Sequence, residues 1–106
     1  MKELTKVEEI LLLAIWRLKD DAYGVKIRQY VSQITGKEFT YGNLYSALSQ
    51  LAKKKYVKKT LGDPTPDRRG RRKITYTISP SGTRALKAAR RMNQKMWEDI
   101  ADYAFD

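Results

Sequence analysis

The chain has 106 residues, of which 22 are Lys or Arg and 12 are Asp or Glu, so its formal net charge is +10. This length fits one domain with its own core and is too short for a separate catalytic domain, and the positive charge favours nucleic acid as a partner. Cys and His are absent, which excludes disulfides, thiolate or imidazole metal sites and His- or Cys-based catalysis. We therefore expect no cofactor, no metal and no enzymatic activity.

The first predicted element is a helix that begins with a capping box, Thr5 to Glu8, and runs to about Lys19. Its inward stripe contains Val7, Ile10, Leu11, Ala14, Ile15 and Leu18. A second apolar side is formed by Leu12, Leu13 and Trp16. Because a small monomer cannot bury a helix on all sides, we expect this second side to be covered by a partner chain or by the last helix of the same chain.

The apolar run in this first helix, from Ile10 to Ile15, is far too short to cross a bilayer, and charged residues interrupt the segment. The N-terminus therefore does not resemble a signal peptide. The expectation is a cytoplasmic protein, associated with the nucleoid, that has no membrane partner.

A second helix is predicted to open at Tyr23-Gly24 and to end near Gly36, which fits a left-handed position after a helix. Its apolar residues at helical spacing are Ile27, Tyr30, Val31 and Ile34.

The third predicted helix begins after Thr40, a good N-cap residue, and its inward stripe is Leu44, Ala47, Leu48 and Leu51. No acidic residue occurs between Tyr41 and Gly62, so the outward face can approach polyanionic DNA and offer donors and acceptors to base edges. A polar helix surface without a partner is the alternative. The candidate DNA-binding residues of this helix are Tyr41, Asn43, Tyr45, Ser46, Ser49, Gln50 and Lys53.

After Lys55 the apolar period changes to two, which predicts strands over 56–61 and 73–78 around a turn-rich basic loop, Gly62 to Arg72. Ten of the 22 cations but two of the 12 acids lie between residues 41 and 78. Such a hairpin with a basic tip can neutralise phosphates, and a disordered linker is the alternative. The candidate phosphate-binding residues here are Arg68, Arg69, Arg71, Arg72 and Lys73, with Lys53, Lys54 and Lys58 nearby.

The last helix is predicted to begin at Ser79-Pro80 and to reach about Tyr103. Apolar residues at alternating spacings of three and four, with Asn93 among them, indicate a coiled-coil seam. This helix either packs on the first helix of its own chain, or forms a dimer interface, or does both. The candidate dimer residues are Leu12, Leu13, Trp16, Leu86, Ala89, Asn93, Met96, Trp97, Ile100 and Tyr103.

The order of elements predicts a mostly α (α+β) fold, a winged helix-turn-helix over residues 1–78 followed by a C-terminal dimerisation helix over 79–106. Its third helix would enter the major groove of double-stranded DNA, and the hairpin tip would lie along the flanking backbone or in the minor groove. An RNA-binding or protein-assembly adaptor shares this fold and is the competing function. The basic hairpin tip favours duplex DNA, because RNA-binding modules more often expose stacked aromatic side chains.

Three segments also resemble the PadR-type (phenolic acid decarboxylase regulator) family of transcriptional repressors. They are TYGNLYSALSQLAKKKYV from Thr40 to Val57, YGVKI from Tyr23 to Ile27, and GRRKITYTIS from Gly70 to Ser79. The resemblance implies a homodimeric repressor of the subgroup with a single C-terminal helix, acting on a palindromic operator. In some relatives a planar compound sits between aromatic side chains at the dimer centre, which suggests a small planar aromatic inducer beside Trp16 and Trp97. Two tryptophans that belong only to the core are the alternative.

Two residues depart from the family pattern. Ser46 stands where the family usually has Pro, and this substitution adds a hydroxyl to the predicted DNA-facing side. Lys55 stands where the family has Gly, just after the third helix, where a left-handed conformation is expected. Lys55 should therefore be strained, or the helix end should be rearranged.

Overall fold

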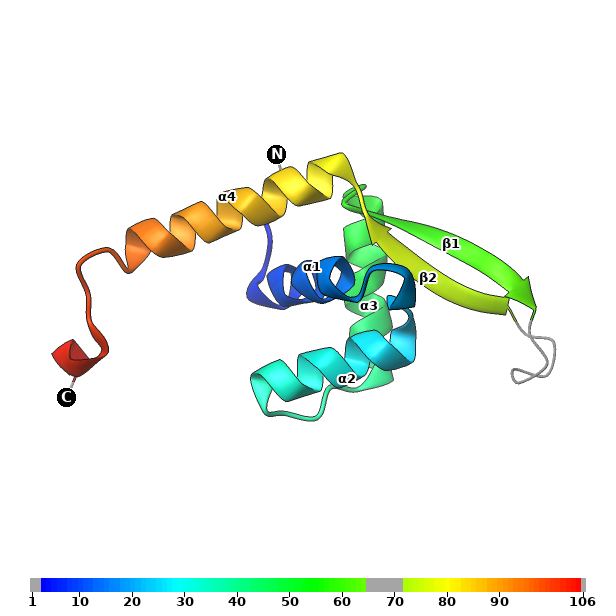
Figure 1. Ribbon diagram of the computed structural model, residues 1–106, viewed down its shortest axis with the longest axis horizontal. Helices are drawn as coiled ribbons and strands as arrows, with labels where there is room; N and C mark the ends of the chain where they lie inside the picture. The colour runs from blue at the N-terminus through cyan, green and yellow to red at the C-terminus, as the bar shows by residue number, and fades with distance from the viewer. Residues whose placement is uncertain (1–2, 65–71, 106) are drawn as a thin grey trace.

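The computed structural model describes residues 3–64 and 72–105. The first three α-helices form the body of the protein, and the strands and the last α-helix follow them in the chain (Figure 1). In chain order the elements are α1 (Lys6–Leu18), η1 (Lys19–Asp21), α2 (Gly24–Thr35), α3 (Tyr41–Lys53), β1 (Val57–Pro64), β2 (Arg72–Ile78), α4 (Pro80–Met96) and η3 (Asp102–Phe105). α1 packs against α2, α3, α4 and β2, so it is the central element. The hairpin and α4 extend from this body in opposite directions, and the mostly helical winged helix-turn-helix is confirmed.

Polar caps start three of the helices, as the sequence predicts. The Thr5 hydroxyl accepts a hydrogen bond from the Glu8 amide at 3.1 Å, and the Glu8 carboxylate accepts one from the Thr5 amide at 2.8 Å. Thr40 caps α3 by accepting from the amide of Asn43 at 3.2 Å. Ser79 caps α4 with Pro80 in its first turn. These side chains satisfy amide groups that have no partner inside a helix, and so fix where each helix begins.

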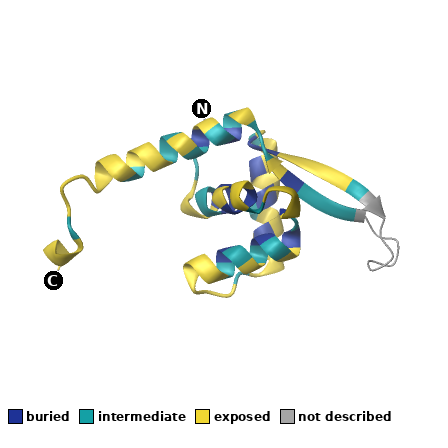
Figure 2. Ribbon diagram, viewed as in Figure 1, coloured by how far each residue is buried: buried dark blue, intermediate teal, exposed yellow. Residues whose placement is uncertain are grey.

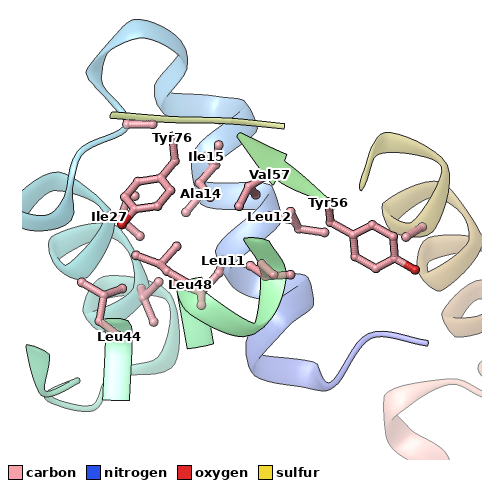
Figure 3. Packing of buried hydrophobic residues seen from close by; sticks show 14 residues of the cluster. Leu11, Leu12, Ala14, Ile15, Ile27, Leu44, Leu48, Tyr56, Val57 and Tyr76 are labelled. Carbon is pink, nitrogen blue, oxygen red and sulfur yellow. The ribbon is translucent and has the colours of Figure 1, made fainter. Parts of the chain in front are cut away.

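The hydrophobic core lies where α1, α2, α3 and the hairpin meet (Figure 3). Its largest fully buried side chains are Leu11, Leu12, Ile15, Ile27, Leu44, Leu48, Leu51 and Val31. The predicted inward stripe of α3 is therefore confirmed. Ile34, one of the apolar residues at helical spacing in α2, lies on the last turn of that helix and is 60% exposed.

The hairpin is a two-stranded antiparallel sheet in which Val57 pairs with Ile78 and Leu61 with Ile74. An irregularity separates Leu61 from Pro64, and β1 runs further than the sequence predicted. The Tyr76 amide donates to the Ala22 carbonyl at 2.8 Å, and Tyr23 forms a bridge with Thr75. These contacts attach β2 to the start of α2, so that the hairpin and the helices form one body.

Lys55 follows α3 with a φ of 63°, the left-handed conformation expected from the departure at this position. Its amide donates to the Ala52 carbonyl, and the Tyr56 amide donates to the Leu51 carbonyl, both at 3.0 Å. These two bonds form a Schellman motif, which normally uses Gly because a Cβ is strained there. The Ser79 and Ser81 hydroxyls donate to the Lys55 carbonyl at 2.7 and 2.9 Å, which ties this turn to the start of α4.

α4 ends at Met96, so the prediction of one helix to about Tyr103 was wrong. Asp99 has a φ of 62°, and the chain turns before η3. Acidic residues at 98 and 99 are unfavourable beside the negative end of a helix dipole, which is one physical reason for the stop. Ile100 and Tyr103 therefore do not continue a helical seam with Leu86, Ala89, Asn93 and Met96. Among the described residues, no helix has the length and apolar character needed to span a lipid bilayer.

Candidate nucleic-acid interface

The outward face of α3 is formed by the side chains that the sequence assigned to it. All seven candidates are exposed: Tyr41, Asn43, Tyr45, Ser46, Ser49, Gln50 and Lys53. The inward stripe is fixed by burial of Leu44, Leu48 and Leu51, so this polar face cannot rotate into the core. The result is an acid-free helix surface that is exposed to solvent; exposed residues are yellow in Figure 2.

An arginine that sequence analysis did not single out belongs to this surface. The Arg28 guanidinium, on α2, lies 4.6 Å from the centroid of the Tyr41 ring, and the Tyr41 and Tyr45 rings stack at 6.2 Å. Arg28 also donates from Nε to the Phe39 carbonyl and lies 3.3 Å from the Glu38 carboxylate. Arg28, Tyr41 and Tyr45 thus form one stack, which holds the first turn of α3 against α2. Only the tertiary contact reveals it, because residues 28 and 41 belong to different helices.

Tyr45, one of the exposed candidate residues of α3, also has a structural role. A Cβ on Gly24 would lie 2.4 Å from the Tyr45 hydroxyl, so the small residue at the start of α2 makes room for this ring. Burial of the Tyr76 hydroxyl, together with the nearby Tyr45 phenol, raises the pKa of Tyr76. Tyr45 therefore helps to seat α3 against α2 and β2, while about half of its surface remains exposed.

Two lysines expected to neutralise phosphates are engaged within the protein. Lys54 donates to both oxygens of the buried Glu8 carboxylate at 2.8 Å, and only 19% of its side chain is exposed. Lys73 lies 3.8 Å from the centroid of the Tyr23 ring and 3.8 Å from the Asp21 carboxylate. Both ammonium groups are held by tertiary neighbours that the sequence does not reveal. Lys54 is therefore no longer a candidate for phosphate contact, and Lys73 mainly attaches the hairpin to the segment before α2.

The other basic residues of α3 and the hairpin divide into exposed residues and residues outside the described part of the chain. Lys53, Lys58 and Lys59 are exposed. Arg68, Arg69 and Arg71 lie outside the described residues, and only the backbone of Arg72, at the start of β2, is described. The described part of the basic surface is therefore α3 with the adjoining strand β1.

The candidate dimer residues divide into buried and exposed groups. Leu12 is 0% exposed in the protomer's own core, so its assignment to a dimer interface was wrong. Leu13 and Trp16 on α1 and Leu86 on α4 line a groove of about 400 Å³. The Asn93 amide donates to the Glu9 carboxylate at 3.0 Å, which joins α4 to α1 in the same chain. The second apolar side of α1 is thus partly covered by α4 and partly open.

The described residues contain no group of three or more Asp, Glu, His or Cys side chains that could hold a metal ion. The site is instead a polar and basic protein surface, whose chemistry suits contact with an extended anion.

Several solved structures are similar to this chain. RosR from H. salinarum is similar with a TM-score of 0.67 and 22% identity, covering 95% of this chain and 84% of that chain. A transcriptional regulator from Clostridium thermocellum gives 0.65 and 24%, covering 91% and 93%. A PadR family transcription regulator from Clostridium difficile gives 0.64 and 21%, covering 93% and 98%. At these identities the likeness shows a shared fold.

No match was found among curated protein sequences. A family model, in contrast, matches residues 12–88, which include α2, α3, the hairpin and the first half of α4. These residues carry the exposed polar face of α3 and its supports. Since the match extends over most of the chain, the chain belongs to the transcriptional regulator PadR-like family.

Proposed function

We propose that this regulator binds double-stranded DNA as a homodimer, reads a palindromic operator with α3 and acts as a repressor. The observation that carries the proposal is the exposed, acid-free face of α3, which presents Asn43, Ser46 and Gln50 together. Amide and hydroxyl groups on a helix surface can pair with base edges in the major groove. Residues 1–78 would then form the DNA-binding unit, and residues 79–106 the dimerisation segment.

The charges near α3 support a duplex as the partner. Lys53 is exposed on α3, and Lys58 and Lys59 are exposed on β1, the strand that follows α3. Lysines in such positions neutralise phosphates without reading sequence, and base contacts add the selectivity. The hairpin projects from the same body as α3, as expected for a wing that lies along the flanking backbone (Figure 1).

Exposed apolar side chains support the dimer. Leu13, Trp16, Met92 and Met96 lie on α1 and α4 and are each at least 38% exposed. Large apolar side chains gathered on two neighbouring helices are typical of an interface between protein chains. A two-fold dimer would place two α3 helices about one turn of DNA apart, roughly 34 Å.

A band-shift titration on duplex DNA from the region upstream of the chain's own gene tests the proposal. A dimer that neutralises ~6–10 phosphates should lose about a thousandfold or more in affinity between roughly 50 and 200 mM salt. Footprints should show two half-sites one helical turn apart. Equal affinity for unrelated duplexes would contradict operator recognition, and tighter binding to the matching RNA would favour the RNA-binding alternative.

We also propose that binding of a small planar aromatic ligand releases the protein from DNA. The groove lined by Leu13, Trp16 and Leu86 has a volume in the range of small-molecule sites. Titration with planar aromatic cations should quench tryptophan fluorescence and weaken the band shift, and Trp16→Phe and Trp97→Phe would assign the signal. An unchanged fluorescence across a broad panel would leave both tryptophans with a packing role alone.

A further inference from the structure

Tyr41 places an aromatic ring at the start of the exposed face of α3. It is the first residue of the helix, and 42% of it is exposed. A recognition helix usually contacts base edges through its N-terminal residues. Asn43 and Ser46 supply hydrogen-bonding groups to this part of the surface, whereas the Tyr41 ring supplies apolar area. The group that this ring contacts on a partner should therefore be apolar.

The Tyr41 ring is held by two other side chains. The Arg28 guanidinium, from α2, lies 4.6 Å from the ring centroid. The Tyr45 ring lies 6.2 Å from it, with its plane at 19° to that of Tyr41. Cation–π contacts and ring stacking both act through the face of a ring. Together the two neighbours fix the plane of the Tyr41 ring before any partner binds.

Both supporting side chains are themselves anchored. Arg28 donates from Nε to the Phe39 carbonyl and from Nη2 to the Glu38 carboxylate at 3.3 Å, and only 26% of its side chain is exposed. The Tyr45 hydroxyl lies so close to Gly24 that a Cβ there would come within 2.4 Å of it. Because the Glu38 carboxylate balances the charge of the guanidinium, Arg28 is better suited to hold a neighbouring ring than to neutralise a DNA phosphate.

Thymine offers the group that matches such a ring. In the major groove its 5-methyl group is the apolar feature that distinguishes it, while the other base edges present donors and acceptors. A donor or acceptor placed against an aromatic ring loses water without gaining a hydrogen bond, so the ring favours the methyl group. A ring that is already fixed in place also loses little side-chain freedom on binding.

We propose that Tyr41 contacts the 5-methyl group of one thymine in each half-site of the operator, and that Arg28 is the positioning residue that holds the ring for this contact. Asn43 and Ser46 remain the residues for polar base edges. This inference rests on the proposed binding of duplex DNA by a homodimer, and it names a base that the start of α3 selects.

Removal of a single methyl group tests the contact. The full chain first selects its preferred duplex from a pool of random duplexes, and each dT of that duplex is then replaced in turn by deoxyuridine (dU), which lacks only the 5-methyl group. Binding is measured by fluorescence anisotropy. At one dT of each half-site the replacement should weaken binding about fourfold, the effect of leaving one methyl group unburied. Tyr41→Phe, which keeps the ring, should keep this ratio, and Tyr41→Ala should abolish it.

Arg28→Met tests the positioning role, because it removes the cation and both hydrogen bonds but keeps a long side chain. The ratio between dT and dU should fall below about twofold, since the ring loses its support. Lys37→Met is the matched control: it removes the same charge from an exposed residue beside Glu38 and should keep the full ratio. The slope of log affinity against log salt should not change for Arg28→Met. A slope smaller by about 1 would place Arg28 on a phosphate and overturn its positioning role.

The outcomes separate this inference from the proposed function. A preferred duplex that is insensitive to every dU replacement overturns the inference alone. A dU effect that persists in Tyr41→Ala, or that disappears in Tyr41→Phe, also overturns it, because the ring is then not what contacts the methyl group. The absence of any preferred duplex would contradict operator recognition itself, and the inference would fail with it.

Discussion

The Glu8 carboxylate and the Lys54 ammonium meet at 2.8 Å through both carboxylate oxygens, and they join the first turn of α1 to the end of α3. The same carboxylate caps α1 through the Thr5 amide. One buried acid therefore fixes a helix start and positions the far end of the helix that carries the candidate DNA-binding face. This relationship leads to the first prediction.

Glu8→Gln should lower the free energy of unfolding at pH 7 by about 1–3 kcal/mol, because Lys54 loses its charged partner. Burial of the carboxyl raises the pKa of Glu8, but the hydrogen bonds to Lys54 and Thr5 and the Lys54 charge outweigh burial, so the pKa lies below its ordinary value of 4.5. A carboxyl group whose pKa is lower in the folded than in the unfolded state stabilises the fold at pH values above its unfolded pKa. This stabilisation is lost as the pH falls through the folded pKa. Denaturant titrations from pH 7 downward should therefore show the two proteins converging below about pH 4.5. If the difference in free energy of unfolding between the two proteins stayed constant with pH, the charge of Glu8 would not be the cause of the stabilisation.

Lys55→Gly should raise the free energy of unfolding by about 1 kcal/mol, because the left-handed φ of 63° strains a residue that has a Cβ. The Schellman hydrogen bonds use only backbone atoms and should survive the change. Thermal and urea unfolding provide the measurement. Lys53→Gly, two residues earlier at the last helical residue of α3, should instead lower the free energy of unfolding, by up to about 1 kcal/mol. An unchanged or lowered melting temperature for Lys55→Gly would contradict the strain.

Gly82→Ala should destabilise the protein by more than 2 kcal/mol, since its Cβ would lie 2.1 Å from the Tyr56 carbonyl oxygen. That oxygen belongs to the backbone and accepts a hydrogen bond from the Ser79 amide, so it cannot move without loosening the start of α4. Gly42→Ala, in α3, meets no atom within 4 Å and should leave stability unchanged or raise it by up to about 1 kcal/mol. Equal effects of the two substitutions on urea unfolding would show that the close approach is unimportant.

Asn43→Ala and Lys53→Gln should separate base reading from phosphate binding. Loss of the Asn43 amide should weaken binding to the preferred duplex by about 1–3 kcal/mol, roughly 5-fold to 150-fold, with little effect on unrelated duplexes. Loss of the Lys53 charge should weaken both and reduce the slope of log affinity against log salt by about 1. Fluorescence anisotropy at several salt concentrations measures both quantities. A uniform loss from Asn43→Ala would remove this residue from the base contacts.

The sequence by itself determined the elements whose cause is local. Thr5, Thr40 and Ser79 could be identified as caps because a hydroxyl before a helix binds the amides of its first turn. The apolar stripe of α3 fixed which face points outward, and the position of Lys55 predicted its left-handed turn. The alternation from Lys73 to Ile78 predicted β2 because strands have a period of two. Periodicity, capping and turn chemistry act between residues a few positions apart, so one sequence is enough to find them.

Only the tertiary structure decided which side chains remain available to a partner. Lys54 and Lys73 have the same local appearance as other lysines, yet Glu8 and Tyr23 hold their ammonium groups. Arg28 joined the α3 surface, and Leu12 moved from the expected interface into the core, through contacts between helices. α4 stopped at Met96 although the apolar spacing continued beyond it. The contacts of the first four residues join positions that are distant in sequence. The end of α4 depends on whether other parts of the protein pack against the helix. Neither a distant contact nor missing packing leaves a periodic pattern in the sequence.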